Sequence, residues 1–298
     1  MAAERGTLVR AASVYVLPDA TSAKVAMVER GQETVVLEHT PGWIRVMATL
    51  ADAPYNPNSE PRQERSVAGW MLDKGYIGEN TVNGDQVLFG EAADSEDQAS
   101  RSLGRKGAAG DARRLYYRVF DLFPKSPLAA EALFRAADIQ WQLERAELQS
   151  RALYKTLTPD ERQPMDEQFL RLVHKKFPGS RWDELAAYEM LDNKLCGDWS
   201  VASNCPEHEA DVYEKYAAQH PNSPKAPEAL YNAGYRWAAA MAIYGAQGKA
   251  KKIPEAQQRA VASAQKLLQK NASPEWNAKA QRLLYVVQNN IPVYGAAE

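Results

Sequence analysis

The chain of 298 residues contains only two cysteines and four histidines. So few cysteines exclude a small secreted scaffold held together by many disulfides. The formal net charge is only −2, from 36 basic and 38 acidic residues, so the charge balance gives no support to a nucleic-acid partner. No run approaches the roughly 18 apolar residues that a membrane-spanning helix needs. We therefore expect a protein without a transmembrane segment.

A secretory signal is also missing from the printed sequence. Residues 1–10 carry Glu4, Arg5 and Arg10 and lack the apolar core of about 7–15 residues that such a signal requires. We expect either a cytoplasmic protein or a mature form with an added initiator methionine. What the chain does contain is ordinary for a folded protein, with 45% hydrophobic and 25% charged residues, and its length favours about two domains.

Residues 7 to about 78 have the pattern of short β-strands. Segments rich in β-branched and aromatic residues, such as Val25–Glu29, alternate with turn signals such as Pro41-Gly42. This spacing predicts a small barrel over residues 5–84. The proline-rich stretch Asp52–Arg65 predicts a long loop between two of its strands.

The second half of the chain has a different periodicity. Residues 85–110 are poor in large apolar side chains and are predicted to be an interdomain linker, with a partly helical connector as the alternative. From Asp111 onward the apolar residues recur at helical spacing, as in Leu115, Val119 and Leu122. The segment 111–292 is therefore predicted to be all α-helical, with eight or nine helices, which makes the fold class α+β with two domains.

The helical part contains a repeat in which one helix ends before a proline and the next helix follows a serine. The repeated serines are Ser126, Ser180, Ser223 and Ser273. Each hydroxyl is expected to accept a hydrogen bond from a free N–H at the next helix start, and Pro127, Pro224 and Pro274 are expected at the first helical position. Such a hairpin cannot bury its apolar stripe alone, so the copies are expected to stack.

The segment 117–134 has the pattern Tyr-x-x-x-x-x-Phe-Pro-x-Ser-Pro-x-Ala-x-Glu-Ala-Leu-Phe. It resembles the helix-turn-helix of tetratricopeptide-type proteins of the bacterial envelope, namely the BamD-like outer-membrane lipoproteins and the YbgF (CpoB) periplasmic family. The resemblance covers residues 111–290. It implies an α-solenoid whose groove holds a protein partner, located in the bacterial periplasm or cell envelope. The lipobox cysteine of the lipoproteins is absent.

The N-terminal part resembles bacterial SH3-like (SH3b) domains through Gly42-Trp-Ile-Arg-Val46, Gly69-Trp-Met71 and Gly75-Tyr-Ile77. This resemblance implies an SH3-like β-barrel that binds peptidoglycan, another envelope ligand or a protein. Aromatic rings suit half-buried binding sites, and five of them are the candidate ligand-binding or partner-binding residues: Tyr15, Trp43, Tyr55, Trp70 and Tyr76. The alternative is that the tryptophans pack the barrel or its junction with the helices.

Cys196 and Cys205 lie in the polar segment Lys194–Pro206. The resemblance to envelope proteins implies a disulfide between them, which fits an oxidising compartment. A reduced pair is one alternative, and a metal site completed by His208 and His220 is another, although this spacing matches no strong zinc pattern. Five acidic residues around this segment are predicted to form a solvated face: Asp192, Asp198, Glu207, Glu209 and Asp211.

The sequence contains no motif typical of an enzyme, such as Gly-x-Ser-x-Gly, His-Glu-x-x-His or a phosphate-binding loop. We therefore expect no catalytic residues, no cofactor and no metal. The expected function is that of a non-catalytic scaffold of the cell envelope, in which the helical part binds a protein and the barrel binds peptidoglycan or a second protein. An accessory subunit whose barrel docks onto its own helices is the first alternative, and a hydrolase with an unrecognised site is the second.

Overall fold

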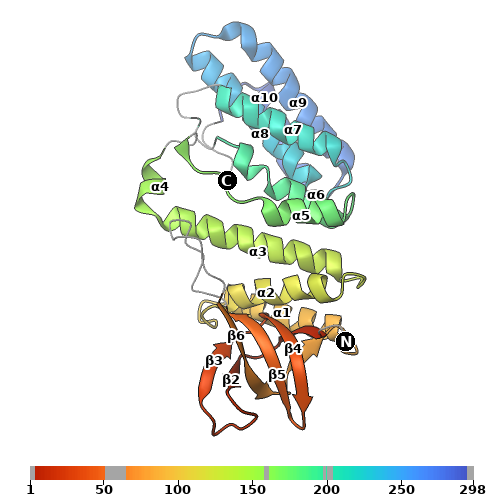
Figure 1. The fold of residues 1–298 in the computed structure, drawn as a ribbon. Helices are drawn as coiled ribbons and strands as arrows, with labels where there is room; N and C mark the ends of the chain where they lie inside the picture. The colour runs from red at the N-terminus through yellow and green to blue at the C-terminus, as the bar shows by residue number, and fades with distance from the viewer. Residues whose placement is uncertain (1–3, 51–64, 158–160, 197–198, 200–203, 294–298) are drawn as a thin grey trace. The chain divides into compact units, whose positions relative to one another are not determined.

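The computed structural model of the protein describes residues 4–50, 65–157, 161–196, 199 and 204–293 (Figure 1). The chain divides into two compact units, which we call unit 1 (Met1–Leu143) and unit 2 (Glu144–Glu298). Unit 1 contains an antiparallel β-sheet followed by helices, and the described part of unit 2 is helical. The predicted α+β organisation is thus confirmed. Within the described residues, no helix is both long and apolar enough to cross a membrane.

Unit 1 begins with a seven-stranded antiparallel sheet in the spatial order β3-β2-β6-β5-β4-β1-β7. The strands are β1 (Glu4–Leu8), β2 (Ala12–Tyr15), β3 (Lys24–Val28), β4 (Glu33–Thr40), β5 (Trp43–Leu50), β6 (Arg65–Leu72) and β7 (Tyr76–Gly78). Among these described strands, β3 pairs with β2 alone and β7 pairs with β1 alone. Each edge strand is therefore paired on one side only, and β3 and β7 do not pair with each other. The predicted closed barrel is wrong: the sheet is open.

Strict alternation along β5 and β6 gives the sheet one buried side and one outer side. On β5, Ile44 and Val46 are fully buried, whereas Arg45 between them is exposed. On β6, Val67 and Met71 are buried in the same way. These side chains form the core of the sheet together with residues of the other strands, chiefly Leu8, Val14, Val28 and Val36.

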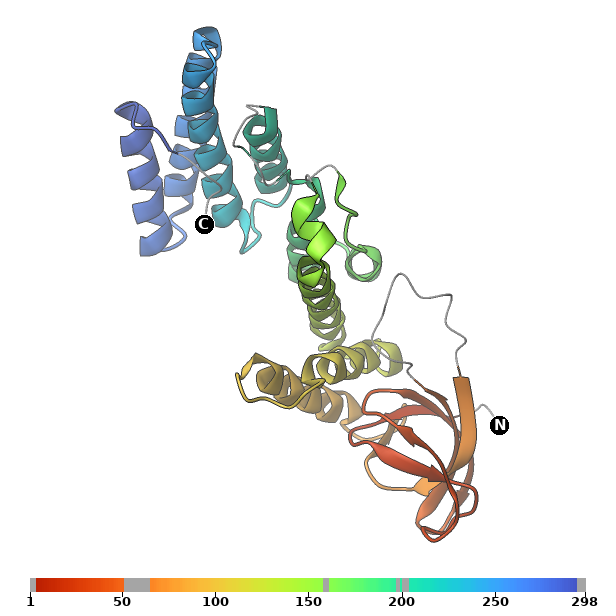
Figure 2. The same cartoon turned by 90° about the vertical axis from the view of Figure 1, so that its left-hand side faces the viewer.

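The sheet is joined directly to helices α1 (Gly84–Ser100) and α2 (Ala108–Leu122), which pack against each other beside it (Figure 2). Residues 85–110, predicted to be a linker with a partly helical connector as the alternative, are mostly helical. Leu88 of α1 and Leu115 of α2 are fully buried in one cluster that also contains Ile77 of β7. This shared cluster fixes the sheet to the first helices. Helix α3 (Ala129–Ser150) follows and runs through the boundary between the two units.

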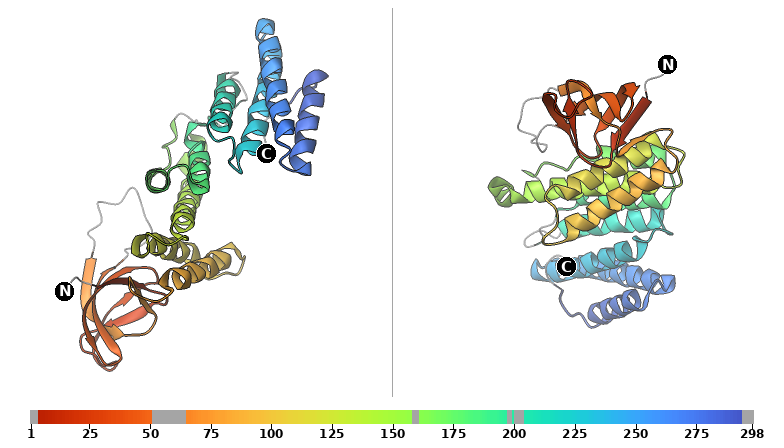
Figure 3. Two further views of the ribbon diagram at one scale, coloured as in Figure 1. Left: turned by 90° about the vertical axis from the view of Figure 1, so that its right-hand side faces the viewer. Right: turned by 90° about the horizontal axis from the view of Figure 1, so that it is seen from below.

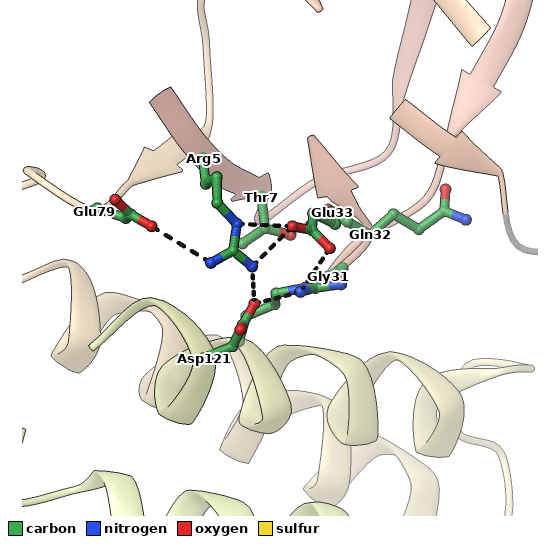
Figure 4. A network of polar contacts seen from close by, with 8 residues as sticks. Arg5, Thr7, Gly31, Gln32, Glu33, Glu79 and Asp121 are labelled. Carbon is green, nitrogen blue, oxygen red and sulfur yellow. Dashed lines mark hydrogen bonds and ion pairs between the residues drawn. The ribbon is translucent and has the colours of Figure 1, made fainter. Parts of the chain in front are cut away.

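A network of ion pairs also joins the sheet to α2 (Figure 4). The Arg5 guanidinium on β1 lies 2.8 Å from a carboxylate oxygen of Glu33 and 2.8 Å from one of Asp121. Arg118 of α2 contacts the same Asp121 carboxylate at 2.6 Å and donates its Nε–H to the carbonyl oxygen of Gly31 at 3.2 Å. Hydrogen bonding to Glu33, and then to Asp121, raises the pKa of Arg5, so this cation stays charged.

Gly31 lies in a turn of the sheet that packs closely against α2. Among the glycines of unit 1 with positive φ, it has the least room for a Cβ. Its φ is +73°, and an added Cβ would lie 2.6 Å from the Cβ of Arg114 and 2.9 Å from the backbone nitrogen of Leu115. We expect Gly31→Ala to lower the free energy of unfolding by about 2 kcal/mol, because the left-handed backbone disfavours alanine and α2 must also move away. Urea denaturation measures the loss.

Gly42 supplies a matched control for this substitution. Its φ is +75°, but nothing lies within 4 Å of the position that its Cβ would take. Gly42→Ala therefore carries the backbone cost alone, about 1 kcal/mol. Equal losses for the two variants would contradict the close approach of α2 to the sheet.

The described part of unit 2 contains the end of α3, then short helical segments and two long hairpins, which can be followed in Figure 3. Its helices are α4 (Ala152–Thr156), α5 (Gln168–Lys176), α6 (Arg181–Glu189), α7 (Asn204–Gln219), α8 (Ala226–Ala246), α9 (Ile253–Lys270) and α10 (Pro274–Gln288), with short 3₁₀ turns η2 (Asp192–Lys194) and η3 (Ala250–Lys252). Gly234 lets α8 approach α10 closely, since a Cβ there would lie 2.7 Å from Cδ2 of Leu283.

The repeated serines have the role that the sequence predicts. Ser180 and Ser273 are the N-cap residues of α6 and α10, and each hydroxyl accepts a hydrogen bond from the N–H three residues later, at 3.1 and 3.3 Å. Ser126 and Ser223 each accept from the N–H two residues later, at 3.1 Å. The prediction that these serines satisfy free N–H groups near helix starts is confirmed.

The repeated prolines follow the prediction only in part. Pro274 is the first residue of α10, as expected. Pro127 and Pro224 instead precede the first residues of α3 and α8. A single turn comes before each of these two helices. The N–H of Ala129 donates a hydrogen bond to the carbonyl oxygen of Ser126 at 3.1 Å, and the N–H of Ala226 donates one to that of Ser223 at 3.0 Å.

Candidate binding surfaces

The outer side of strands β2, β5 and β6 carries a cluster of aromatic and aliphatic side chains. We call it the aromatic face, and it consists of Tyr15, Trp43, Met47, Trp70 and Leu72. Tyr15 lies opposite Trp70 in the sheet register, and Trp43 lies opposite Leu72. The rings of Tyr15 and Trp43 meet edge to face with their centroids 5.8 Å apart. Three of the five candidate aromatic residues are thus brought together.

The aromatic face is open to solvent although it is largely apolar. Met47 is 44% exposed and Leu72 is 50% exposed. Arg45 lies within the face, opposite Trp70 in the register, and its guanidinium is 3.8 Å from the carboxylate of Glu38. Apolar ring surface beside a charged pair can pack against aliphatic side chains or sugar rings and still donate hydrogen bonds at its edge.

Tyr76, another candidate, does not belong to the aromatic face. It lies on β7 opposite Leu8 of β1, and its ring packs against the sheet core and over Gly6. Its hydroxyl is buried and has no hydrogen-bond partner among the described residues. Burial, with a smaller contribution from the charge of Glu4, raises the pKa of Tyr76. Its position is that of a packing residue, and the remaining candidate, Tyr55, lies outside the described residues.

Cys196 and Cys205 form a disulfide in unit 2, with their Cα atoms 6.0 Å apart. This confirms the predicted bond, and the alternative of a reduced pair is not supported. Because both sulfur atoms are in the bond, the proposed metal ligands do not assemble either. Nε2 of His208 lies 3.1 Å from a backbone carbonyl oxygen, and the ring of His220 packs against Tyr216 with the centroids 4.9 Å apart.

Beside the disulfide lies a buried ion pair. Glu209 is only 1% exposed, and its Oε2 accepts hydrogen bonds from Nε of Arg236 at 2.6 Å and from Nε1 of Trp199 at 3.1 Å. The Arg236 guanidinium carbon also lies 4.5 Å from the ring centroid of Tyr213. The Sγ atom of Cys205 is 3.8 Å from the other carboxylate oxygen. A buried charge is stable only when it is paired, so this group holds Trp199 against α7 and α8.

The burial of Glu209 corrects the prediction that the acidic residues of this region form a solvated face. Glu207 and Asp211, on either side, do remain near the surface, each in an ion pair. The periodicity of α7 carries the signal that the sequence analysis missed. Glu209 follows Cys205 by four residues and precedes Tyr213 by four, which places it on the buried stripe of the helix.

The SH3-like and tetratricopeptide resemblances depend on the motif residues of this chain alone. In coarse outline the structure agrees with them: the N-terminal part is an antiparallel sheet, and helical hairpins follow it. Comparison with known proteins found no match to the chain, either among protein-family models or among curated protein sequences.

Proposed function

We propose that the protein is a non-catalytic scaffold of the bacterial cell envelope. Its sheet binds peptidoglycan or a second protein through the aromatic face, and its helical unit 2 binds a segment of a protein partner. The observation that carries the proposal is the exposure of the aromatic face, where Met47 and Leu72 are both about half exposed. Contiguous apolar patches of this kind mark interaction sites on folded proteins.

Two further observations support the proposal. The motifs around Trp43 and Trp70 resemble those of SH3-like domains, and the serine-proline repeat resembles that of tetratricopeptide proteins, both of which include envelope binding modules. The Cys196–Cys205 disulfide is typical of proteins in an oxidising compartment. The bacterial periplasm is such a compartment.

An accessory subunit whose sheet docks onto its own helices is the alternative, and the ion pairs of Arg5 and Arg118 favour it. In that alternative the aromatic residues seal the contact. The sheet residues that contact α1 and α2, however, include Gly31 and Ile77, and these belong to other strands or turns than the aromatic face. The sheet therefore contacts its own helices through one surface and leaves the aromatic face free for a ligand. A scaffold can have both surfaces.

Leu72→Arg tests the aromatic face in the full-length protein. A guanidinium introduced into an apolar contact is desolvated without a partner charge, so we expect binding to fall at least about tenfold, which corresponds to about 1.4 kcal/mol. Two measurements apply: co-sedimentation with purified peptidoglycan, and retention of partners from an envelope extract on the immobilised protein.

Leu103→Arg is the matched control, because Leu103 is 98% exposed, lies between α1 and α2 and is not one of the residues of the aromatic face. It makes the same chemical change and is expected to bind like the wild type. Loss of sedimentation in Leu72→Arg alone assigns peptidoglycan to the face, and loss of a protein assigns that protein. Equal binding by all three forms of the protein would contradict the proposed surface.

A further inference from the structure

We infer that a groove between α7 and α9 of unit 2 binds an extended, acidic segment of a partner protein. Two hollows of about 370 and 390 Å³ form the groove, and Lys270 lines both of them. In the first hollow α7 and α9 supply the walls and Leu230 of α8 contributes to the lining. The second continues between the α7–α8 turn, at Ser223, and Trp276 of α10. An elongated site of this form suits a chain rather than a compact molecule.

The lysines give the groove a positive charge. Lys266 and Lys270 are both exposed and lie one turn apart on the same side of α9, so in the free protein their like charges repel. Lys270 donates a hydrogen bond to the carbonyl oxygen of Pro221, and Lys266 has no ion-pair partner among the described residues. An anionic occupant offsets this repulsion, because it attracts both lysines.

One carboxylate, that of Glu214, also lines the first hollow, and its oxygens already have partners within the protein. It accepts a hydrogen bond from Nε1 of Trp237 at 2.9 Å and one from Oγ of Ser263 at 3.3 Å. It also forms an ion pair with Arg259. Arg259 is shared with Asp211, so the Glu214 charge is offset only in part. Of the charged side chains that line the first hollow, the two lysines are the ones without an ion-pair partner among the described residues.

Apolar side chains line the groove at both ends. Leu230 in the first hollow is buried beside Ala217. Trp276 in the second hollow packs near Tyr231, with the ring centroids 6.0 Å apart, and Nζ of Lys279 lies 4.4 Å from the centroid of Trp276. A chain that carries acidic residues with an occasional aliphatic residue matches this combination. A nucleic acid does not, because the protein as a whole has a net charge of −2.

The inference deepens the proposed scaffold function and rests on its helical half, because it gives the chemistry of the segment that unit 2 binds. The aromatic face takes no part in it. A separate probe therefore distinguishes failure of the groove from failure of the scaffold function.

The probe is a fluorescein-labelled peptide of Glu-Asp-Leu-Glu repeats, about twelve residues long, which spans roughly 40 Å when extended. Its binding to the full-length protein is followed by fluorescence anisotropy. We expect saturable binding that weakens at least about tenfold in Lys266→Glu/Lys270→Glu. The neutral variant Lys266→Gln/Lys270→Gln is expected to bind with intermediate affinity, and it serves in place of the first if charge reversal impairs folding.

Lys175→Glu/Lys251→Glu is the matched control, because it makes the same change in net charge at exposed positions of unit 2 outside the groove. This control and Leu72→Arg are expected to bind the peptide like the wild type. Equal binding by the groove and control variants, absence of saturable binding, or equal competition by a DNA duplex would each overturn the inference. Loss of binding in Leu72→Arg would overturn it too, by placing the peptide on the aromatic face.

Discussion

Replacing Glu209 with alanine is expected to lower the free energy of unfolding of unit 2 by about 4 kcal/mol. The substitution leaves the Arg236 guanidinium, only 6% exposed, without its counter-charge, and leaves Nε1 of Trp199 without its acceptor. Removing one partner of a buried pair typically costs about 3–5 kcal/mol. Urea denaturation measures the total loss, and hydrogen exchange of the amides in α7 and α8 locates it.

Glu207→Ala provides the control on the same helix. The Glu207 carboxylate lies 3.1 Å from Nζ of Lys252 near the surface, where such a pair contributes about 0–1 kcal/mol. The double variant Glu209→Met/Arg236→Met is expected to recover much of the loss, because no unpaired charge remains. A Glu209→Ala protein as stable as Glu207→Ala would contradict the burial of the Glu209–Arg236 pair.

The β-strands could be predicted because alternation is a local property of the sequence. Trp43 and Trp70 each stand next to a buried residue, Ile44 and Met71, and a period of two places both rings on the outer side. Closure of the sheet is not a local property. It requires β3 and β7 to reach each other, and nothing within either short strand specifies its neighbour, so the predicted barrel was wrong.

Helix α1 was predicted only as an alternative, as part of a partly helical connector, for a related reason. Its buried residues include Leu88, Ala92 and Ser95, and two of these three side chains are too small to give a clear apolar period. Its stability comes from packing on α2 and on Ile77 of the sheet. Contacts with residues distant in the sequence stabilise such a segment, and the local period of apolar residues gives no sign of them.

The positions of the candidate residues in the fold could be predicted to different degrees for similar physical reasons. Tyr15, Trp43 and Trp70 come together because the strand register aligns them, whereas Tyr76 has the same chemistry on a strand that buries it. Lys266 was not singled out, because a lysine on a helix is indistinguishable in sequence from a solvated residue. Only the position of α7 beside α9 makes it part of a groove.

Reducing the Cys196–Cys205 disulfide is expected to lower the free energy of unfolding of unit 2 by about 3 kcal/mol. The bond joins residues separated by nine positions, and the chain-entropy model assigns roughly 2–3 kcal/mol to a loop of this length. Trp199 lies between the two cysteines in the sequence, and its Nε1 donates a hydrogen bond to Glu209. Reduction is therefore also expected to weaken the packing of Trp199 on the buried ion pair. Urea denaturation with and without a phosphine reductant measures the effect.

The Cys196→Ser/Cys205→Ser variant separates the bond from the reagent, because a reductant has no disulfide to act on in this protein. Unit 1 contains no cysteine, so hydrogen exchange in β5 and β6 is expected to stay constant and serves as an internal reference. Alkylation of both thiols without reductant in natively expressed protein would contradict the disulfide, as would equal stability of the oxidised and reduced forms.

The disulfide and the Glu209–Arg236 pair stabilise the same corner of unit 2, since Glu209 follows Cys205 by one helical turn and contacts its sulfur at 3.8 Å. Effects of neighbouring groups are not additive. In the Glu209→Ala protein, Trp199 has already lost its hydrogen-bond acceptor. Opening the loop between the two cysteines then exposes less additional buried surface to water than in the wild type. Reduction is therefore expected to destabilise the Glu209→Ala protein less than the wild type, and equal losses in the two backgrounds would show that the bond and the ion pair act independently.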